Sequence, residues 1–65
     1  MKRYPDATNE SRDVVLTELR NKSQDTLGLL GSTKLPLELI NATIYDLTKN
    51  GKVKYKNRVY NLTIS

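Results

Sequence analysis

Apolar residues at helical spacing predict a first helix over residues 9–21. The residues that form its apolar stripe are Val15, Leu16 and Leu19. The charged residues of this segment mostly fall elsewhere on the helix surface, as expected for a helix that buries one face. Thr8 or Asn9 can cap the first turn.

The next segment is harder to interpret. Residues 22–25 read as a polar connection, and residues 26–31 combine three leucines with two glycines. The glycines argue against a long helix, yet the leucines need a core to pack against. Both a short helix and a strand-like stretch are compatible with this pattern. We favour a helix of about two turns.

A longer helix is predicted over residues 36–50. Its apolar positions recur at intervals of three and four and comprise Leu37, Ile40, Ile44 and Leu47. Pro36 suits the first turn, where its missing N–H would have had no partner. Gly51 follows the last periodic residue and suits the left-handed position that ends many helices.

After Gly51 the pattern alternates, which predicts a β-hairpin over residues 52–64. With Asn57 and Arg58 as a two-residue turn, the facing pairs are Tyr55 with Tyr60 and Val53 with Leu62, and Ile64 extends the same face. Asn tolerates the positive φ of this turn, although Arg is a poor second residue. A shift of one residue would destroy the separation of apolar and polar faces, so this register is strongly specified.

The element order is helix, short helix, long helix and hairpin, which predicts an α+β fold. This order resembles the three-helix winged helix-turn-helix family, whose two-stranded hairpin is the wing. Residues 40–53 resemble the recognition helix of that family running into the wing. The resemblance implies that the third helix lies against nucleic acid and that the wing contacts its backbone. We expect residues 1–8 to form a flexible arm and residues 9–65 a single domain.

The composition argues against catalysis. The chain has 65 residues, no cysteine, no histidine and no tryptophan, and its carboxylates show no obvious pairing. The usual zinc ligands and the usual general base are therefore absent. We expect no enzyme activity, no catalytic or metal-binding residues, no cofactor and no small-molecule substrate.

The charge is concentrated at one end of the chain. The formal net charge is +4, but residues 1–46 carry seven acidic and six basic residues, and residues 47–65 carry five basic residues and no acid. A one-sided cationic field attracts polyanions, and duplex nucleic acid, DNA more than RNA, is the expected partner. The alternative is a solvated strand whose lysines only discourage edge-to-edge aggregation.

The third helix carries a polar stripe displaced from its apolar face, formed by Asn41, Tyr45 and Thr48. Such groups can position phosphates and read base edges. Alternatively, Asn41 and Thr48 are merely solvated and Tyr45 is half-buried against the wing. The candidate nucleic-acid-binding residues are Asn41, Tyr45, Thr48, Lys49, Lys52, Lys54, Lys56, Arg58 and Tyr60. We expect the stripe and the hairpin lysines to face the same way.

A narrower resemblance involves the same helix. The spacing of Asn41 and Tyr45, followed by residues 47–52, is similar to the Zα domains that bind left-handed Z-form DNA and RNA. The resemblance implies that Asn41 contacts phosphate and that Tyr45 faces the nucleic acid together with a wing aromatic, here Tyr60. The chain departs from that family in having Leu37 and Ala42 where the family has lysine and arginine, and in a shorter wing without paired prolines.

A protein-interaction module is the alternative to nucleic-acid binding, since winged helices are reused for docking. Leu35, Leu37 and Leu39 cannot all face one core, so some could contact a second copy of the chain in a homodimer or cover the N-terminal helix. No apolar run approaches the roughly 20 residues that span a bilayer, and no signal peptide is evident. We expect an intracellular protein of the cytoplasm, nucleoid or nucleus that is neither secreted nor bound to membrane.

Overall fold

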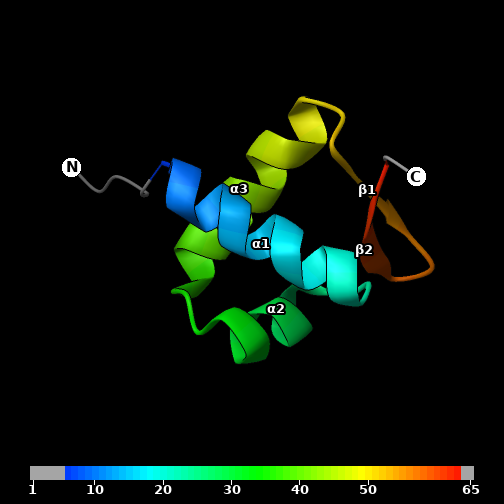
Figure 1. The fold of residues 1–65 in the computed structure, drawn as a ribbon, viewed down its shortest axis with the longest axis horizontal. Helices are drawn as coiled ribbons and strands as arrows, with labels where there is room; N and C mark the ends of the chain where they lie inside the picture. Colours follow the sequence, from blue (N-terminus) through cyan, green and yellow to red (C-terminus); the bar gives the residue numbers. More distant parts are fainter. Residues whose placement is uncertain (1–5, 64–65) are drawn as a thin grey trace.

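A computed structural model describes residues 6–63 and shows three helices followed by an antiparallel hairpin (Figure 1). The elements are α1 (Asn9–Asn21), α2 (Thr26–Thr33), α3 (Leu37–Lys49), β1 (Val53–Lys56) and β2 (Val59–Leu62). The predicted α+β order is thus confirmed and is consistent with a winged helix. Most of the predicted arm, and Ile64, lie outside the described residues. In residues 6–63, no helix combines the length and the apolar character that crossing a bilayer requires.

The first helix begins at a reciprocal cap. The Ser11 backbone N–H donates to Thr8 Oγ1 at 3.0 Å, and the Thr8 N–H donates to Ser11 Oγ at 2.9 Å. These bonds satisfy backbone donors that the first turn of a helix otherwise leaves without partners. Thr8 is therefore fixed to α1, one residue before the expected domain boundary.

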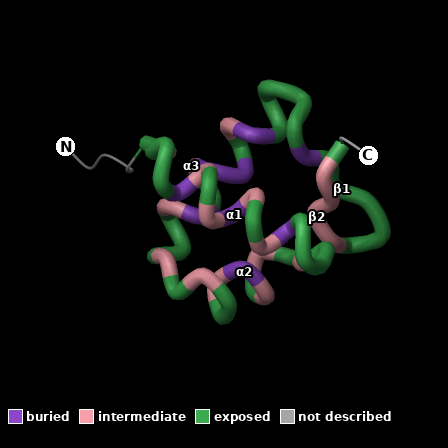
Figure 2. The backbone as a smooth tube through the Cα atoms, in the orientation of Figure 1, coloured by how far each residue is buried: buried purple, intermediate pink, exposed green. Residues whose placement is uncertain are grey.

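The core lies between the three helices and one end of the hairpin (Figure 2). Its buried apolar residues are Val15, Leu19, Leu29, Ile40, Ile44, Leu47 and Val53. The predicted apolar face of α3 is confirmed from Ile40 onward. Leu37 is an exception, with 44% of its surface exposed, because it lies on the first turn of the helix, before the buried part of the face begins.

A buried polar contact joins α1 to α3. Ser11 Oγ and Thr43 Oγ1 are 2.8 Å apart, and both residues are almost fully buried. Each hydroxyl also lies within hydrogen-bond distance of a backbone carbonyl oxygen. Ser11 Oγ is 3.0 Å from Thr8 O, and Thr43 Oγ1 is 2.7 Å from Leu39 O. The two hydroxyls therefore have partners inside the core, as buried polar groups require. Nothing in the periodicity of apolar residues indicates this contact.

The second segment is helical, as favoured, and extends to Thr33. Asp25 caps it by accepting from the Gly28 N–H at 2.8 Å. Of its leucines, Leu29 is fully buried, whereas Leu27 is 73% exposed. The expectation that all these leucines need a core is therefore wrong for Leu27, because one face of this short helix is turned to solvent.

Both ends of α3 are defined by backbone geometry. Pro36 was predicted to lie inside the first turn. It is instead the N-cap, with extended backbone. At the other end Gly51 has a φ of 76°. The Lys52 N–H donates to Leu47 O at 2.8 Å, and the Gly51 N–H donates to Thr48 O at 3.0 Å. This pair of bonds is the Schellman motif, which turns the chain out of the helix and into β1.

The hairpin has the predicted register. Val53 faces Leu62 and Tyr55 faces Tyr60 across the two strands. The turn residues Asn57 and Arg58 both have positive φ, 56° and 67°, as a type I′ turn requires.

One strand contact was not predicted. The Tyr60 N–H donates to Gln24 O at 2.7 Å, so the connection between α1 and α2 forms an isolated β-bridge with β2. The adjacent Ser23 hydroxyl donates to the side-chain oxygen of Asn61. The segment read as a polar connection thus attaches the hairpin to the helices at a second point, separate from the end of α3.

Replacing two glycines should change stability in opposite directions. Gly51→Ala should lower the free energy of unfolding by about 1 to 2 kcal/mol, because a Cβ disfavours the left-handed conformation. Gly31→Ala should raise it by about 0.5 to 1 kcal/mol, since Gly31 is helical and a Cβ there meets no atom within 4 Å. Urea denaturation followed by circular dichroism measures both. If both substitutions changed the free energy of unfolding equally, the left-handed conformation of Gly51 at the end of α3 would be contradicted.

Candidate nucleic-acid interface

The polar stripe of α3 is exposed. Asn41, Tyr45 and Thr48 all lie at the surface, and Tyr45 is 70% exposed. The helical repeat explains this position, because these residues fall to one side of the buried face formed by Ile40 and Ile44. Tyr45 is therefore not half-buried against the hairpin, whereas Asn41 and Thr48 are solvated, as the alternative to a functional role expected.

The stripe and the hairpin line one groove of about 400 Å³. Its lining residues are Asn41, Ile44, Tyr45, Thr48, Tyr55 and Tyr60. Ile44 is buried and belongs to the core, so the polar and aromatic groups stand over an apolar base. Of the predicted site residues, the structure brings Asn41, Tyr45, Thr48 and Tyr60 together here. We call this site the tyrosine groove.

Two of the tyrosines contact each other. The ring centroids of Tyr55 and Tyr60 lie 4.9 Å apart with a tilt of 57°, which is a favourable aromatic arrangement. Tyr60 is partly buried and packs against the core, whereas Tyr55 is 60% exposed. Tyr55 was not among the predicted site residues. The hairpin register already placed it opposite Tyr60, and that signal could have identified it.

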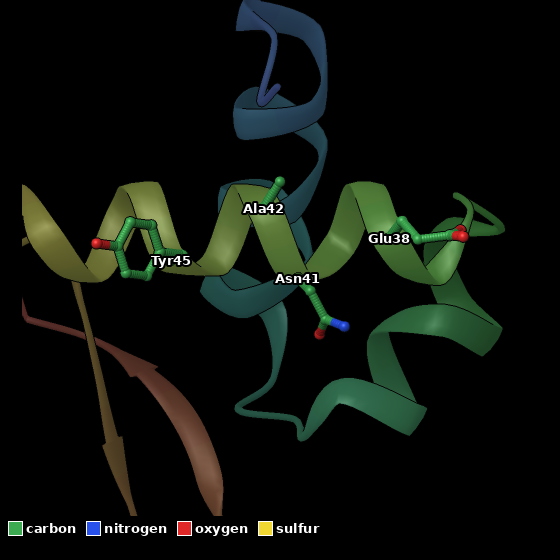
Figure 3. A pocket seen from close by; sticks show the side chains of 4 residues that line it. All are labelled: Glu38, Asn41, Ala42 and Tyr45. Atoms are coloured by element: carbon green, nitrogen blue, oxygen red, sulfur yellow. The ribbon is translucent and has the colours of Figure 1, made fainter. Parts of the chain in front are cut away.

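A second hollow of about 360 Å³ continues along α3, lined by Glu38, Asn41, Ala42 and Tyr45. Figure 3 shows Tyr45 at the end of α3 toward the hairpin, Glu38 at the other end and Asn41 between them. Glu38 and Tyr45 are seven residues apart, which is roughly 10 Å along a helix. A polyanion would be repelled by Glu38, so the hairpin end of α3 is the more favourable place for phosphates.

The hairpin lysines do not face the groove. Lys54 and Lys56 alternate with Tyr55 along β1, so they lie on the opposite face of the hairpin. The expectation that the lysines and the helix stripe face the same way is therefore wrong. The reason is that the apolar face of the hairpin packs against the helices, and α3 with its stripe lies on that side.

The remaining basic candidates lie near the ends of the elements. Lys49 is in the last turn of α3, Lys52 is the last residue of the Schellman motif, and Arg58 is in the hairpin turn; all three are exposed. Within residues 6–63 the single ion pair joins Arg12 to Asp46 at 3.2 Å. The basic candidates are thus not neutralised by carboxylates of the described chain and remain free for an external anion.

Residues 6–63 contain no group of three or more acidic side chains that could hold a metal ion. Comparison with protein-family models, with curated proteins and with solved structures found no match. The resemblances to winged-helix and Zα domains therefore rest on the residues themselves and on their arrangement.

Arg58 occupies a conformation that disfavours it. A side chain at positive φ in the second position of a type I′ turn is less favourable than glycine by about 1 to 2 kcal/mol. Arg58→Gly should raise the free energy of unfolding by about 0.5 to 1 kcal/mol, after the greater chain entropy of glycine is subtracted. Arg58→Ala keeps the strain and should give no gain. Thermal unfolding of both variants measures the difference. An equal change in stability for Arg58→Gly and Arg58→Ala would contradict the positive φ of Arg58 in the turn.

Proposed function

We propose that this chain is a small winged-helix protein that binds duplex nucleic acid, with DNA as the main target, through α3 and the hairpin. The observation that carries the proposal is the tyrosine groove, in which Asn41, Tyr45 and Thr48 of α3 meet two hairpin tyrosines. The exposed groups of this groove, Asn41, Tyr45, Thr48 and Tyr55, are not needed for the core. Thr48 and Tyr55 lie after Asp46, in the part of the chain that has basic residues and no acid.

The side chains of the stripe suit nucleic acid chemically. The Asn41 amide can donate and accept, and the hydroxyls of Thr48 and Tyr45 can do both. Such groups bond phosphate oxygens and base edges, and an α-helix fits the major groove of a duplex. Their position on one helix face lets them act on the same stretch of duplex.

Charge orients the complex. Lys49 and Lys52 would neutralise phosphates at the hairpin end of α3, and Arg58 would do so at the hairpin turn, whereas Glu38 keeps the backbone away from the opposite end of α3. If these three cations each neutralise one phosphate, the logarithm of the binding constant should fall against the logarithm of salt with a slope of about −2.7.

Two substitutions should separate direct contacts from charge. Tyr45→Ala should raise the Kd about tenfold, because a ring or hydroxyl contact of roughly 1.4 kcal/mol is lost, and should leave the salt slope unchanged. Lys49→Gln should make the slope less steep by about 0.9. Fluorescence anisotropy with a labelled duplex at several salt concentrations measures both effects.

Leu27→Ala is the matched control for this experiment, because Leu27 is equally exposed but lies on α2, outside the groove. Its Kd should equal that of the wild type. Unchanged affinity for Tyr45→Ala would remove the tyrosine groove from the interface, and a loss for Leu27→Ala would indicate a different binding surface.

A second candidate function is binding of left-handed duplexes. The observation that favours it is that Asn41, Tyr45 and Tyr60, the three positions of the Zα resemblance, line the same groove. Asn41 and Tyr45 lie on α3 and Tyr60 lies on β2, so their spacing in the sequence did not by itself bring the three side chains together. Leu37 and Ala42, where the family has basic residues, argue for weaker phosphate contacts.

A titration of an alternating CG duplex, followed by circular dichroism, distinguishes the two forms. Left-handed binding should invert the duplex spectrum, and Asn41→Ala should reduce the inversion at equal protein concentration because a phosphate contact is removed. Tight binding without inversion would contradict the left-handed candidate and support recognition of a right-handed duplex.

A further inference from the structure

We propose that α3 reads the sequence of a DNA duplex and that Glu38 selects a cytosine, by accepting a hydrogen bond from its N4 amino group in the major groove. Glu38 was not among the predicted site residues. The inference rests on the proposed function, because α3 is taken to lie against a duplex. It goes further by naming a residue that makes binding depend on sequence, together with the base that this residue recognises.

Glu38 extends the exposed stripe of α3 away from the hairpin. The hollow of about 360 Å³ on this helix is lined by Glu38, Asn41, Ala42 and Tyr45. The last three follow Glu38 at intervals of three, four and seven residues, so all four share one side of the helix. Glu38 is exposed, and Figure 3 shows it beyond Asn41, at the end of the row. A duplex that lies along the stripe past Asn41 therefore meets the Glu38 carboxylate.

The Glu38 carboxylate needs a hydrogen-bond donor from the duplex. Among residues 6–63 the single ion pair joins Arg12 to Asp46, so no cation of the described chain neutralises Glu38. An ionised carboxylate only accepts hydrogen bonds, and its desolvation against a duplex without a donor is unfavourable. Because it repels phosphates, the donor has to lie on a base edge and not on the backbone.

Cytosine is the base whose major-groove edge suits a carboxylate best. It presents the N4 amino group as a donor, whereas guanine presents the acceptors N7 and O6, and thymine presents the acceptor O4 and a methyl group. Adenine has a donor at N6, but the neighbouring acceptor N7 would repel a carboxylate oxygen; an amide such as that of Asn41 fits adenine instead. A side chain that only accepts therefore selects cytosine against the other three bases.

The spacing of Glu38 and Asn41 suits two neighbouring base pairs. Three residues advance an α-helix by about 4.5 Å, and one base pair advances B-DNA by about 3.4 Å. A helix that follows the groove thus places Asn41 over the base pair next to the cytosine. The major groove of B-DNA admits an α-helix, whereas that of A-form RNA is too deep and narrow for side chains to read. Recognition of this kind requires DNA.

Selection from a pool of duplexes with a randomised central segment, followed by sequencing, tests the inference. The wild-type chain should enrich sequences that have a cytosine at one fixed position. Glu38→Ala should lose this preference, because no acceptor remains at that position of α3. Glu10→Ala is the matched control, since Glu10 is also exposed and lies in the first turn of α1, outside the hollow. It removes the same charge and should keep the cytosine.

Fluorescence anisotropy with a selected duplex measures the size of the effect. Replacing the C·G pair with T·A should raise the Kd of the wild type about tenfold. For Glu38→Ala the two Kd values should differ by less than about threefold. Removal of a negative charge also strengthens binding to every duplex alike, but this common change leaves the ratio of the two Kd values unaffected. The ratio therefore reports base recognition separately from charge.

The outcomes separate this inference from the proposed function. Duplex binding by the wild type with no base preference at any position would overturn sequence reading alone. A cytosine preference that Glu38→Ala keeps would also overturn it, as would a preference that Glu10→Ala loses to the same extent. Absence of duplex binding by the wild type would overturn both proposals.

Discussion

Burial of Val53 determines which way both faces of the hairpin point. Fully burying a side chain of this size contributes roughly 1.5 to 3 kcal/mol, and alternation along the strand then assigns every neighbouring residue to a face. Tyr55 lies on the same face as Val53 and Lys54 lies on the other. The Schellman motif at the end of α3 sets where β1 begins, and the bridge from Gln24 to Tyr60 holds β2. The tyrosine groove exists because these three constraints agree.

Local patterns in the sequence were sufficient for most of the fold. The hairpin register was predictable because only one alignment separates apolar from polar residues, and α3 was predictable because Ile40, Ile44 and Leu47 repeat at helical spacing. The contact between Ser11 and Thr43 was not predictable, since two hydroxyls 32 residues apart leave no periodic signal. The bridge to Gln24 was missed for the same reason: a single β-bridge has too few residues to show alternation.

The candidate site was predictable in part. Asn41, Tyr45, Thr48 and Tyr60 meet as their positions suggested, because helix and hairpin each present a defined face. The lysines were placed wrongly because strand alternation separates an apolar face from a lysine face but does not show on which side of the hairpin the α3 stripe lies. That choice belongs to tertiary packing. Once Val53 and Leu62 are required in the core, Lys54 and Lys56 must point outward, and Tyr55 joins the groove.

The proposed nucleic-acid interface consists of the α3 stripe and the inner face of the hairpin. The most direct measurement is a titration of the ¹⁵N-labelled chain with a short duplex, followed by amide chemical shifts. Binding at this interface should give the largest shifts at Asn41, Tyr45, Thr48 and the hairpin tyrosines, with small shifts in α2. Shifts concentrated around Leu27 and the rest of α2, with α3 unaffected, would contradict it.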